Sequence, residues 1–282
     1  MSAQLKPEAC PVAEHAPWDA RATVLACRHI DGEALASVET VIEEVPVALV
    51  YNGISHAVML ASPTDLEDFA LGFSLSEGIL SNPGELYDCE VVHGPGGIEV
   101  RLDIAAARMF GLKERRRNLA GRTGCGLCGV DSLDAAVRTP APVAPRTAVR
   151  ASAIQRALAE LNALQPLHRA TGAAHAAAWA DNDGSLQLVR EDVGRHNALD
   201  KLAGALAAHR VNPADGFAVV TSRASYEMVQ KAATAGIGVL AAISAPTAFA
   251  VRVADAAHVT LVGLARAGRM TVYTHPTQLT GT

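Results

Sequence analysis

The order of hydrophobic and polar positions predicts that the chain has two parts of different architecture. In the first part, apolar and polar residues alternate over 45–51 and again over 54–60, and the pair Asn52-Gly53 between them favours a tight hairpin turn. Apolar residues at helical spacing predict a helix over 66–73, and a glycine-rich turn within 88–104 predicts a second hairpin. We therefore expect a small α+β domain over residues 38–112.

In the second part, helical and strand patterns alternate, which is typical of an α/β domain. We expect this domain to cover residues 148–282 and to contain a largely parallel sheet sandwiched by helices. The expected helices cover 154–164, 197–209, 226–235 and 246–256, and the expected strands cover 175–180, 186–190, 217–221, 238–243, 259–264 and 270–274.

Two further segments lack a periodic apolar pattern. Residues 1–37, which contain three prolines near their start, are expected to form a loosely ordered lead-in. Residues 113–147 combine a basic run, a glycine-rich stretch with two cysteines and a connector rich in proline and alanine. We interpret this second segment as a mobile loop and a linker between the domains.

Composition narrows the classes of function. The chain has 282 residues, 50% of them hydrophobic, and a formal net charge of −5, which argues against a nucleic-acid-binding surface. It has neither an apolar run long enough to span a membrane nor an N-terminal signal sequence, so we expect a cytoplasmic protein with no membrane partner. Its five cysteines are irregularly spaced, which fits a reducing compartment better than a disulfide framework.

The stretch from Gly121 to Asp131 carries the most distinctive chemistry. Cys125 and Cys128 are flanked by glycines, so their sulfur atoms should be accessible. A thiol is nucleophilic only as the thiolate, and nearby positive charge lowers its pKa. That charge is supplied by Lys113, Arg115, Arg116, Arg117 and Arg122.

The spacing of this cysteine pair leaves other interpretations open. A structural zinc site would need two more ligands, and the sequence has neither a second Cys-x-x-Cys nor a suitable pair of histidines. A thioredoxin-type redox pair should follow an apolar strand, which is absent here, and incidental cysteines are normally buried. The pattern favours a loop whose thiolate accepts and passes on a sulfur atom, with no metal bound.

Three polar clusters follow predicted strands of the second part. In open α/β sheets, ligands collect at the carboxyl ends of the strands. Each cluster alone could be a helix cap with surface charge, but together they indicate a pocket for an anionic ligand with several phosphates. The clusters are Arg190–Asn197, which includes His196, Thr221–Ser225, which includes Ser222 and Arg223, and Gly263–Arg269.

Four ordered motifs resemble the family of formate dehydrogenase accessory proteins named FdhD. The resemblance extends from about Val41 to the end of the chain and implies a second domain similar in fold to cytidine deaminase, as a three-layer sandwich. The motifs are RTGCGLCGVDSL from Arg122, EDVGRHNALDKL from Glu191, SRASYEMVQKAA from Ser222 and VGLARAGRMTVYTHP from Val262.

This resemblance implies a sulfur carrier, which is a sulfurtransferase that works through a cysteine persulfide. A cysteine desulfurase would supply the sulfur to Cys125, with Cys128 as an auxiliary or resolving thiol. The carrier would then pass it to the molybdenum bis(molybdopterin guanine dinucleotide) cofactor before insertion into formate dehydrogenase. The cofactor would be held by Leu264, Ala265, Arg266, Ala267, Gly268 and Arg269, although members of the family often have phenylalanine, lysine and proline where this chain has Leu264, Arg266 and Ala267.

The implied partners are a cysteine desulfurase and the formate dehydrogenase apoenzyme, and a homodimer is compatible with the sequence. Two alternatives remain open. The protein could be a chaperone that holds the cofactor or the apoenzyme without chemistry. A zinc deaminase is a weaker alternative, because no proline precedes Cys125 and the metal-ligand segment of that class is missing.

Overall fold

The computed structural model describes residues 18–117, 140–144 and 148–281. Its first part contains a four-stranded sheet with the strand order β4-β3-β6-β5, in which β3 and β6 are parallel and the other pairs antiparallel. The predicted helix and both predicted hairpins of this part are confirmed. The elements are β3 (Val45–Tyr51), β4 (Ile54–Ala61), α1 (Leu66–Ser76), β5 (Leu86–Gly94), β6 (Gly97–Ile104) and α2 (Ala106–Arg117), with a short 3-10 turn at Pro83–Glu85.

The second part is built on a six-stranded sheet with the order β13-β12-β11-β10-β8-β9. The expectation of a largely parallel sheet is wrong, because only two pairs of neighbouring strands in this sheet, β10–β11 and β11–β12, are parallel. Short hairpin turns join β8 to β9 and β12 to β13, and such turns make neighbouring strands antiparallel. The strands are β8 (His175–Asp181), β9 (Leu186–Asp192), β10 (Gly216–Val220), β11 (Val239–Ala242), β12 (Thr260–Arg266) and β13 (Arg269–Val272).

Helices cover both faces of the six-stranded sheet. On one face, Ile154, Ala157 and Leu161 of α4 pack on the small side chains of the central strands. On the other face, α6, α7 and α8 bury Leu199, Met228 and their apolar neighbours. The helices are α4 (Ala151–Leu161), α5 (Pro166–Thr171), α6 (Arg195–Ala208), α7 (Tyr226–Thr234) and α8 (Ala248–Ala256), and a small strand pair β7 (Val149–Arg150) and β14 (Leu279–Thr280) lies near the C-terminus.

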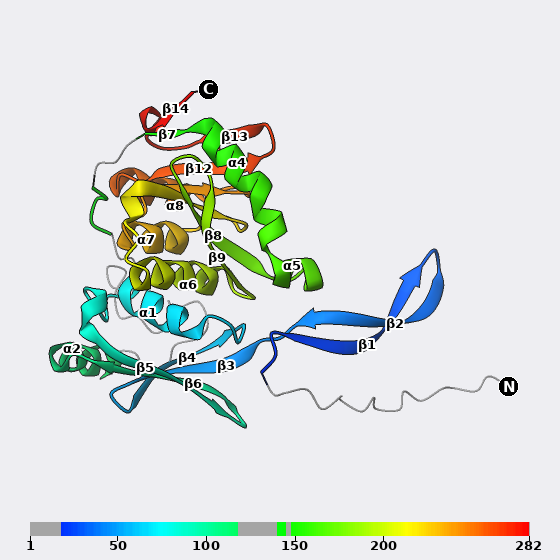
Figure 1. The fold of residues 1–282 in the computed structure, drawn as a ribbon, viewed down its shortest axis with the longest axis horizontal. Coiled ribbons are helices and arrows are strands. Elements are labelled where there is room, and N and C mark those ends of the chain that lie inside the picture. Colours follow the sequence, from blue (N-terminus) through cyan, green and yellow to red (C-terminus); the bar gives the residue numbers. More distant parts are fainter. Residues whose placement is uncertain (1–17, 118–139, 145–147, 282) are drawn as a thin grey trace.

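Helices α1 and α6 stack between the two sheets and join the two parts (Figure 1). They cross at Gly72 and Gly204, where the backbones touch. A Cβ atom on Gly72 would lie 1.8 Å from the carbonyl oxygen of Asp200, and one on Gly204 would lie 1.8 Å from that of Asp68. Only glycine therefore allows this packing.

A buried ion pair also connects the two parts. The Nζ of Lys201 lies 2.7 Å from Oδ2 of Asp192, and both side chains are fully buried. Lys201 also donates to the carbonyl oxygen of Ser62, and Asp192 accepts from the Ser62 backbone N–H. Because each charge has several partners across the junction, the pair fixes the loop before α1 against the end of β9.

Residues 1–17 of the expected loosely ordered lead-in lie outside the described residues, and the rest of it differs from that expectation. Residues 21–42 form an antiparallel hairpin of β1 (Arg21–Ile30) and β2 (Glu33–Ile42), which projects away from the body (Figure 1). Asp31 and Gly32 both have positive φ, and an Asp-Gly pair favours a two-residue hairpin turn. That dipeptide is the signal that indicates the hairpin in the sequence.

The expected domain limits stay predictions, although α2 continues through the expected boundary at residue 112 as far as Arg117. The sequence also does not predict α5, which has six residues and begins at Pro166. Within the described residues, none of the helices has the length and apolar character needed to span a membrane.

Candidate functional site

The carboxyl ends of four strands meet at one edge of the six-stranded sheet. Strands β10, β11 and β12 are parallel, and β9 has the same direction because it is antiparallel to β8, which is antiparallel to β10. The three predicted polar clusters follow β9, β10 and β12, so the topology brings them to the same edge. From β9 to β12 this edge extends roughly 19 Å, at about 4.8 Å per strand.

Backbone hydrogen bonds connect the loops along this edge. Thr247 donates to the carbonyl oxygen of Ala224 at 3.0 Å, which joins the loops after β10 and β11. Leu264 donates to the carbonyl oxygen of Ser244 at 3.1 Å, which joins the loop after β11 to the end of β12. These bonds join the loops into one continuous surface, which a ligand at this edge would contact.

The predicted cofactor segment forms the end of β12 and the turn into β13. A register shift between Gly263 and Arg266 gives Leu264 a φ of 51°, and its side chain is 40% exposed. Ala265 is fully buried in the core beneath, so it supports the segment and cannot contact a ligand through its side chain. A bulky residue in the left-handed region is uncommon, and such residues concentrate at functional sites.

Arginines lie on both sides of the turn. Arg266 and Arg269 face each other in the β12–β13 pair, both are exposed, and neither makes an ion pair with another described residue. Ala267 and Gly268 form the exposed turn, where Gly268 has a φ of 74°. A hollow of about 320 Å³ lies beside this turn and is lined by Leu264, Arg266, Arg269, Met270 and Thr271.

Gln155 of α4 fixes the position of this turn. Its Oε1 accepts from the Gly268 backbone N–H at 3.0 Å, and its Nε2 donates to the carbonyl oxygen of Arg269 at 3.4 Å. We expect Gln155→Ala to leave the free energy of unfolding within about 1 kcal/mol of wild type, because partly exposed hydrogen bonds contribute little. The amide of Gly268 should exchange its hydrogen faster, as measured by hydrogen–deuterium exchange. Unchanged exchange at Gly268 would contradict this role.

The N-termini of α6 and α7 also lie at this edge. Neither helix has a side-chain cap, so their first backbone N–H groups are available to an anion. The Nε of Arg195 and the Oγ of Ser225 are buried and have no hydrogen-bond partner in the described part of the chain. Buried polar atoms are normally paired, so these two atoms are candidates for contact with a polar ligand.

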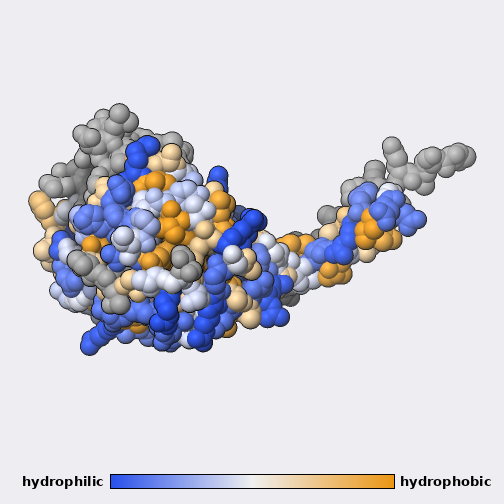
Figure 2. Space-filling view, turned by 90° about the horizontal axis from the view of Figure 1, so that it is seen from above, coloured by the Kyte–Doolittle hydropathy of each residue, from blue (hydrophilic) through white to orange (hydrophobic). Residues whose placement is uncertain are grey.

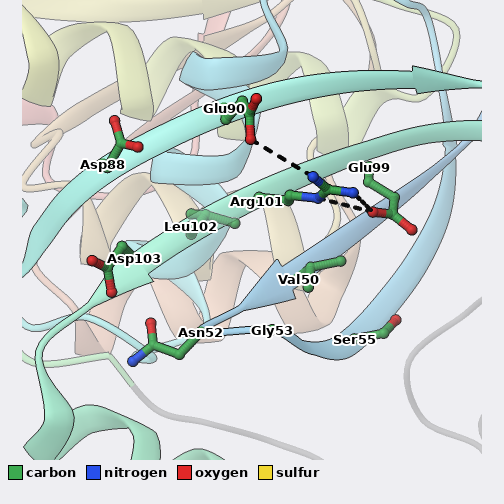
Figure 3. Close-up of a pocket in the computed structure, with 10 residues that line it drawn as sticks. All are labelled: Val50, Asn52, Gly53, Ser55, Asp88, Glu90, Glu99, Arg101, Leu102 and Asp103. Carbon is green, nitrogen blue, oxygen red and sulfur yellow. Dashed lines mark hydrogen bonds and ion pairs between the residues drawn. The ribbon is translucent and has the colours of Figure 1, made fainter.

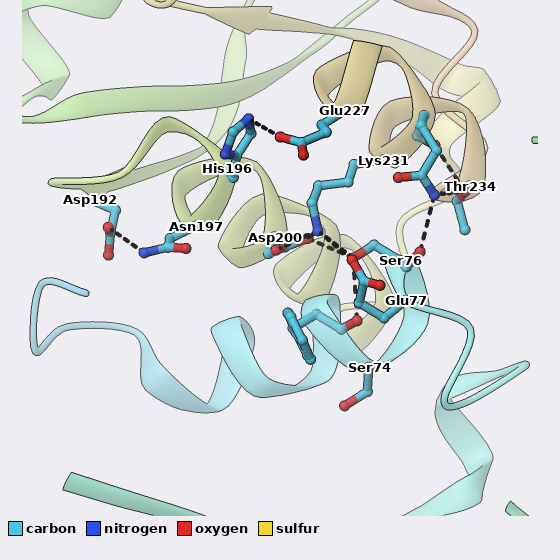
Figure 4. A network of polar contacts seen from close by, with 12 residues as sticks. Ser74, Ser76, Glu77, Asp192, His196, Asn197, Asp200, Glu227, Lys231 and Thr234 are labelled. Carbon is cyan, nitrogen blue, oxygen red and sulfur yellow. Dashed lines mark hydrogen bonds and ion pairs between the residues drawn. The ribbon is translucent and has the colours of Figure 1, made fainter. Parts of the chain in front are cut away.

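A histidine and a carboxylate connect the first turns of these helices. The Nε2 of His196 lies 2.7 Å from Oε2 of Glu227 (Figure 4). This hydrogen bond lowers the pKa of Glu227, which keeps its carboxylate ionised. Burial and the nearby charge of Arg195 lower the pKa of His175, so His175 is neutral at pH 7.

Much of the cluster Arg190–Asn197 has a structural role. The two carboxylate oxygens of Glu191 accept from the first backbone N–H groups of α5 at 2.8 Å. Asp192 accepts from the side chain of Asn197 and is paired with Lys201. Arg190 is paired with Asp68 of α1 at 2.7 Å. Of this cluster, Arg195 and His196 remain as candidates for ligand contact.

Two more predicted residues follow β10. Ser222 is buried, and its hydroxyl donates to the carbonyl oxygen of Arg223. Arg223 is exposed and makes no ion pair with the described residues. Arg223 is therefore the better candidate for ligand contact of the two.

Sequence reasoning missed His175, Ser225 and Glu227 as individual candidates. His175 begins β8, and only the antiparallel direction of that strand places it at the carboxyl edge of β10. Cys125, Cys128 and Arg122 lie outside the described residues, so their assignment stays a prediction.

The fold and this edge define a mixed α/β protein whose second part presents arginines and open helix N-termini at one sheet edge. The sequence profile of the FdhD/NarQ family matches residues 42–280. The chain belongs to this family.

Similar proteins agree with this assignment. The chain is 59% identical over 248 residues to a sulfur carrier protein FdhD of Cupriavidus necator, which covers 88% of this chain and 86% of that protein. It is 55% identical over 241 residues to one of Bordetella petrii, covering 86% and 87%. A solved structure described as a formate dehydrogenase accessory protein of Desulfotalea psychrophila has a TM-score of 0.73 at 23% identity, covering 93% of this chain and all of that one. That structure supports the fold.

Proposed function

We propose that this chain is the sulfur carrier required for an active formate dehydrogenase. It takes persulfide sulfur from a cysteine desulfurase onto Cys125 and passes it to molybdenum bis(molybdopterin guanine dinucleotide) before that cofactor is inserted. The proposal is supported by the identity to proteins named sulfur carrier protein FdhD. These exchanges need reduced thiols, so we place them in the cytoplasm.

The first step is an exchange between a thiolate and a persulfide. The thiolate of Cys125 attacks the outer sulfur of the donor persulfide, so a new S–S bond forms on Cys125 and the donor cysteine leaves as a thiolate. Cys128 then attacks the inner sulfur, which forms a disulfide with Cys125 and releases hydrosulfide. The two thiols supply both electrons for this release, and a cellular dithiol reductant restores the pair.

The single observation that carries the binding part of this proposal is the unsatisfied polar edge of the six-stranded sheet. A guanine dinucleotide carries a diphosphate, and diphosphates are held by arginine side chains and helix N-termini. Arg195 and Ser225 have buried atoms without described partners, and Arg266 and Arg269 are exposed and make no ion pair with another described residue. These residues fit the nucleotide part of the cofactor, and the metal-bearing pterin would extend from that part.

The expected effect of a charge reversal tests this assignment. Arg269→Glu should weaken the binding of GDP, used as the soluble nucleotide half of the cofactor, by at least about tenfold, because a favourable charge contact becomes repulsive. Isothermal titration calorimetry measures this change. The matched control is Arg101→Glu, the same reversal at an exposed arginine of β6, on the sheet of the first part, and it should leave GDP affinity unchanged. Equal affinity for wild type and Arg269→Glu would remove the assignment.

A further inference from the structure

A buried ion pair between α6 and α7 lies beneath the candidate site. Many hydrophilic side chains lie at the surface of the body, as the space-filling view shows (Figure 2). Asp200 and Lys231, in contrast, are only 1% and 6% exposed, and the Nζ of Lys231 lies 2.9 Å from both carboxylate oxygens of Asp200 (Figure 4). Aspartate and lysine are almost never so buried unless they are paired. The burial of these two charges therefore calls for an explanation.

The C-terminal end of α1 completes this buried group. The hydroxyl of Ser76 donates to Oδ1 of Asp200 at 2.7 Å and accepts from the Nζ of Lys231 at 3.0 Å. The side chain of Gln230 donates to the carbonyl oxygen of Ser76 at 3.2 Å, and Oε1 of Glu77 lies 3.5 Å from the Nζ of Lys231. Hydrogen bonds therefore connect the three helices α1, α6 and α7 at one point.

Apolar contacts already hold α6 and α7 together. Leu199 and Leu202 of α6 and Met228 of α7 are fully buried in the same apolar core. Replacing a buried ion pair by apolar side chains of similar volume is often neutral or stabilising, because taking two charges out of water costs much of what their attraction gains. Apolar contacts depend little on direction, whereas hydrogen bonds between charged groups have a preferred geometry. A buried pair of this kind can fix the placement of two helices without adding much stability.

The pair lies one helical turn from the contact between His196 and Glu227. His196 precedes Asp200 by four residues on α6, and Glu227 precedes Lys231 by four residues on α7. Residues four apart lie on the same face of a helix, separated by about 6 Å along its axis. The carboxylate belongs to α7 in the first contact and to α6 in the second. Sliding α7 along α6 by one turn would break both contacts and, in one direction, place two carboxylates side by side.

We propose that Asp200 and Lys231 are positioning residues for the polar edge of the six-stranded sheet and, being buried, contact no ligand themselves. Arg195 begins α6 and Ser225 immediately precedes α7, and both side chains have a buried atom without a hydrogen-bond partner in the described part of the chain. The buried pair fixes these two helix starts relative to each other, so that both can contact one anionic group. A binding site loses affinity when its groups move by about 1 Å. This positioning role rests on the proposed function, because it requires that the edge holds the diphosphate of the cofactor.

The test removes both charges at once, because a single replacement would leave one buried charge without its partner. The double variant Asp200→Asn/Lys231→Met keeps both side chains close to their original size. Its dissociation constant for GDP, measured by isothermal titration calorimetry, should rise about tenfold or more. Its midpoint of urea unfolding should stay at or above that of wild type. Unchanged GDP affinity would overturn the proposal, and so would a lower midpoint, because the pair would then serve the cohesion of the helices.

Sulfur loading separates positioning from a general loss of structure. Cys125 does not belong to these helices, so a cysteine desulfurase should load the double variant with sulfur to the same extent as wild type. Intact-mass spectrometry measures the loading. A double variant that loses sulfur loading together with GDP binding would contradict a role confined to the polar edge.

The matched control neutralises an ion pair on the other sheet. Arg101 lies 2.9 Å from Glu99 on β6, and their side chains are 51% and 50% exposed (Figure 3). Arg101→Met/Glu99→Gln should leave GDP affinity as in wild type, because exposed ion pairs contribute little. A wild type that binds no GDP would overturn the proposed function and the positioning role with it. GDP binding that is present in wild type and unchanged in Asp200→Asn/Lys231→Met would overturn the positioning role alone.

Discussion

Replacing Cys125 with alanine is expected to abolish the maturation of formate dehydrogenase while leaving the carrier folded. Alanine cannot form the persulfide, so no sulfur reaches the cofactor by the proposed route. The measurement is formate dehydrogenase activity in cells that lack their own carrier and express the variant. Activity should fall to that of cells without any carrier, and the variant should still bind GDP as wild type does.

Two other cysteines provide matched controls. Burial, followed by the nearby carboxylates of Glu67 and Asp88, raises the pKa of Cys89 to about 11, so its thiol is protonated at neutral pH and is a poor nucleophile. Cys27 is exposed on the hairpin of β1 and β2, far from the six-stranded sheet. Cys27→Ala and Cys89→Ala should therefore support full activity. A chaperone that only holds the cofactor would also survive Cys125→Ala, and that outcome would favour the alternative without chemistry.

Gly204→Ala is expected to destabilise the protein strongly. The new Cβ would lie 1.8 Å from the carbonyl oxygen of Asp68 and 2.9 Å from the backbone nitrogen of Gly72, so α1 and α6 would have to separate. Backbone contacts cannot relax as flexible side chains can. We expect a loss of about 3 kcal/mol or more, a large share of the stability of a typical domain. Urea denaturation measures it.

Alanine in place of Gly111 is expected to have the opposite effect on stability. Gly111 lies inside α2, and nothing stands within 4 Å of the position that a Cβ would take. Gly111→Ala should therefore raise the free energy of unfolding by about 0.5–1 kcal/mol, because alanine favours helix more than glycine does. Equal stability of Gly204→Ala and wild type would show that the helix crossing is not as close as described.

The sequence was sufficient to predict most elements of the fold because their signals are local. The pair Asn52-Gly53 and the flanking alternation identify one hairpin, and the apolar spacing of 66–73 identifies α1. The mixed strand order of the larger sheet could not be predicted in this way, because it depends on which strands meet after folding. The hairpin of β1 and β2 had a local signal at Asp31-Gly32, but the prolines before it suggested disorder.

The candidate site, like the fold, could be predicted only in part from the sequence. Three polar clusters could be placed at one sheet edge because each follows a predicted strand. The roles of the individual residues could not be predicted. Glu191 and Asp192 look like ligand-binding residues in the sequence, but Glu191 caps α5 and Asp192 pairs with Lys201. Gly204 likewise looks like an ordinary helix position until α1 is packed against it.

The proposed function depends on Cys125 carrying a sulfur atom. Its most direct test is intact-mass spectrometry of the purified protein after incubation with a cysteine desulfurase and cysteine, followed by peptide mapping. Wild type should gain the mass of one sulfur atom on the peptide containing Cys125, and Cys125→Ala should gain none. A wild type that gains no sulfur, or a Cys125→Ala variant that gains as much as wild type, would contradict it.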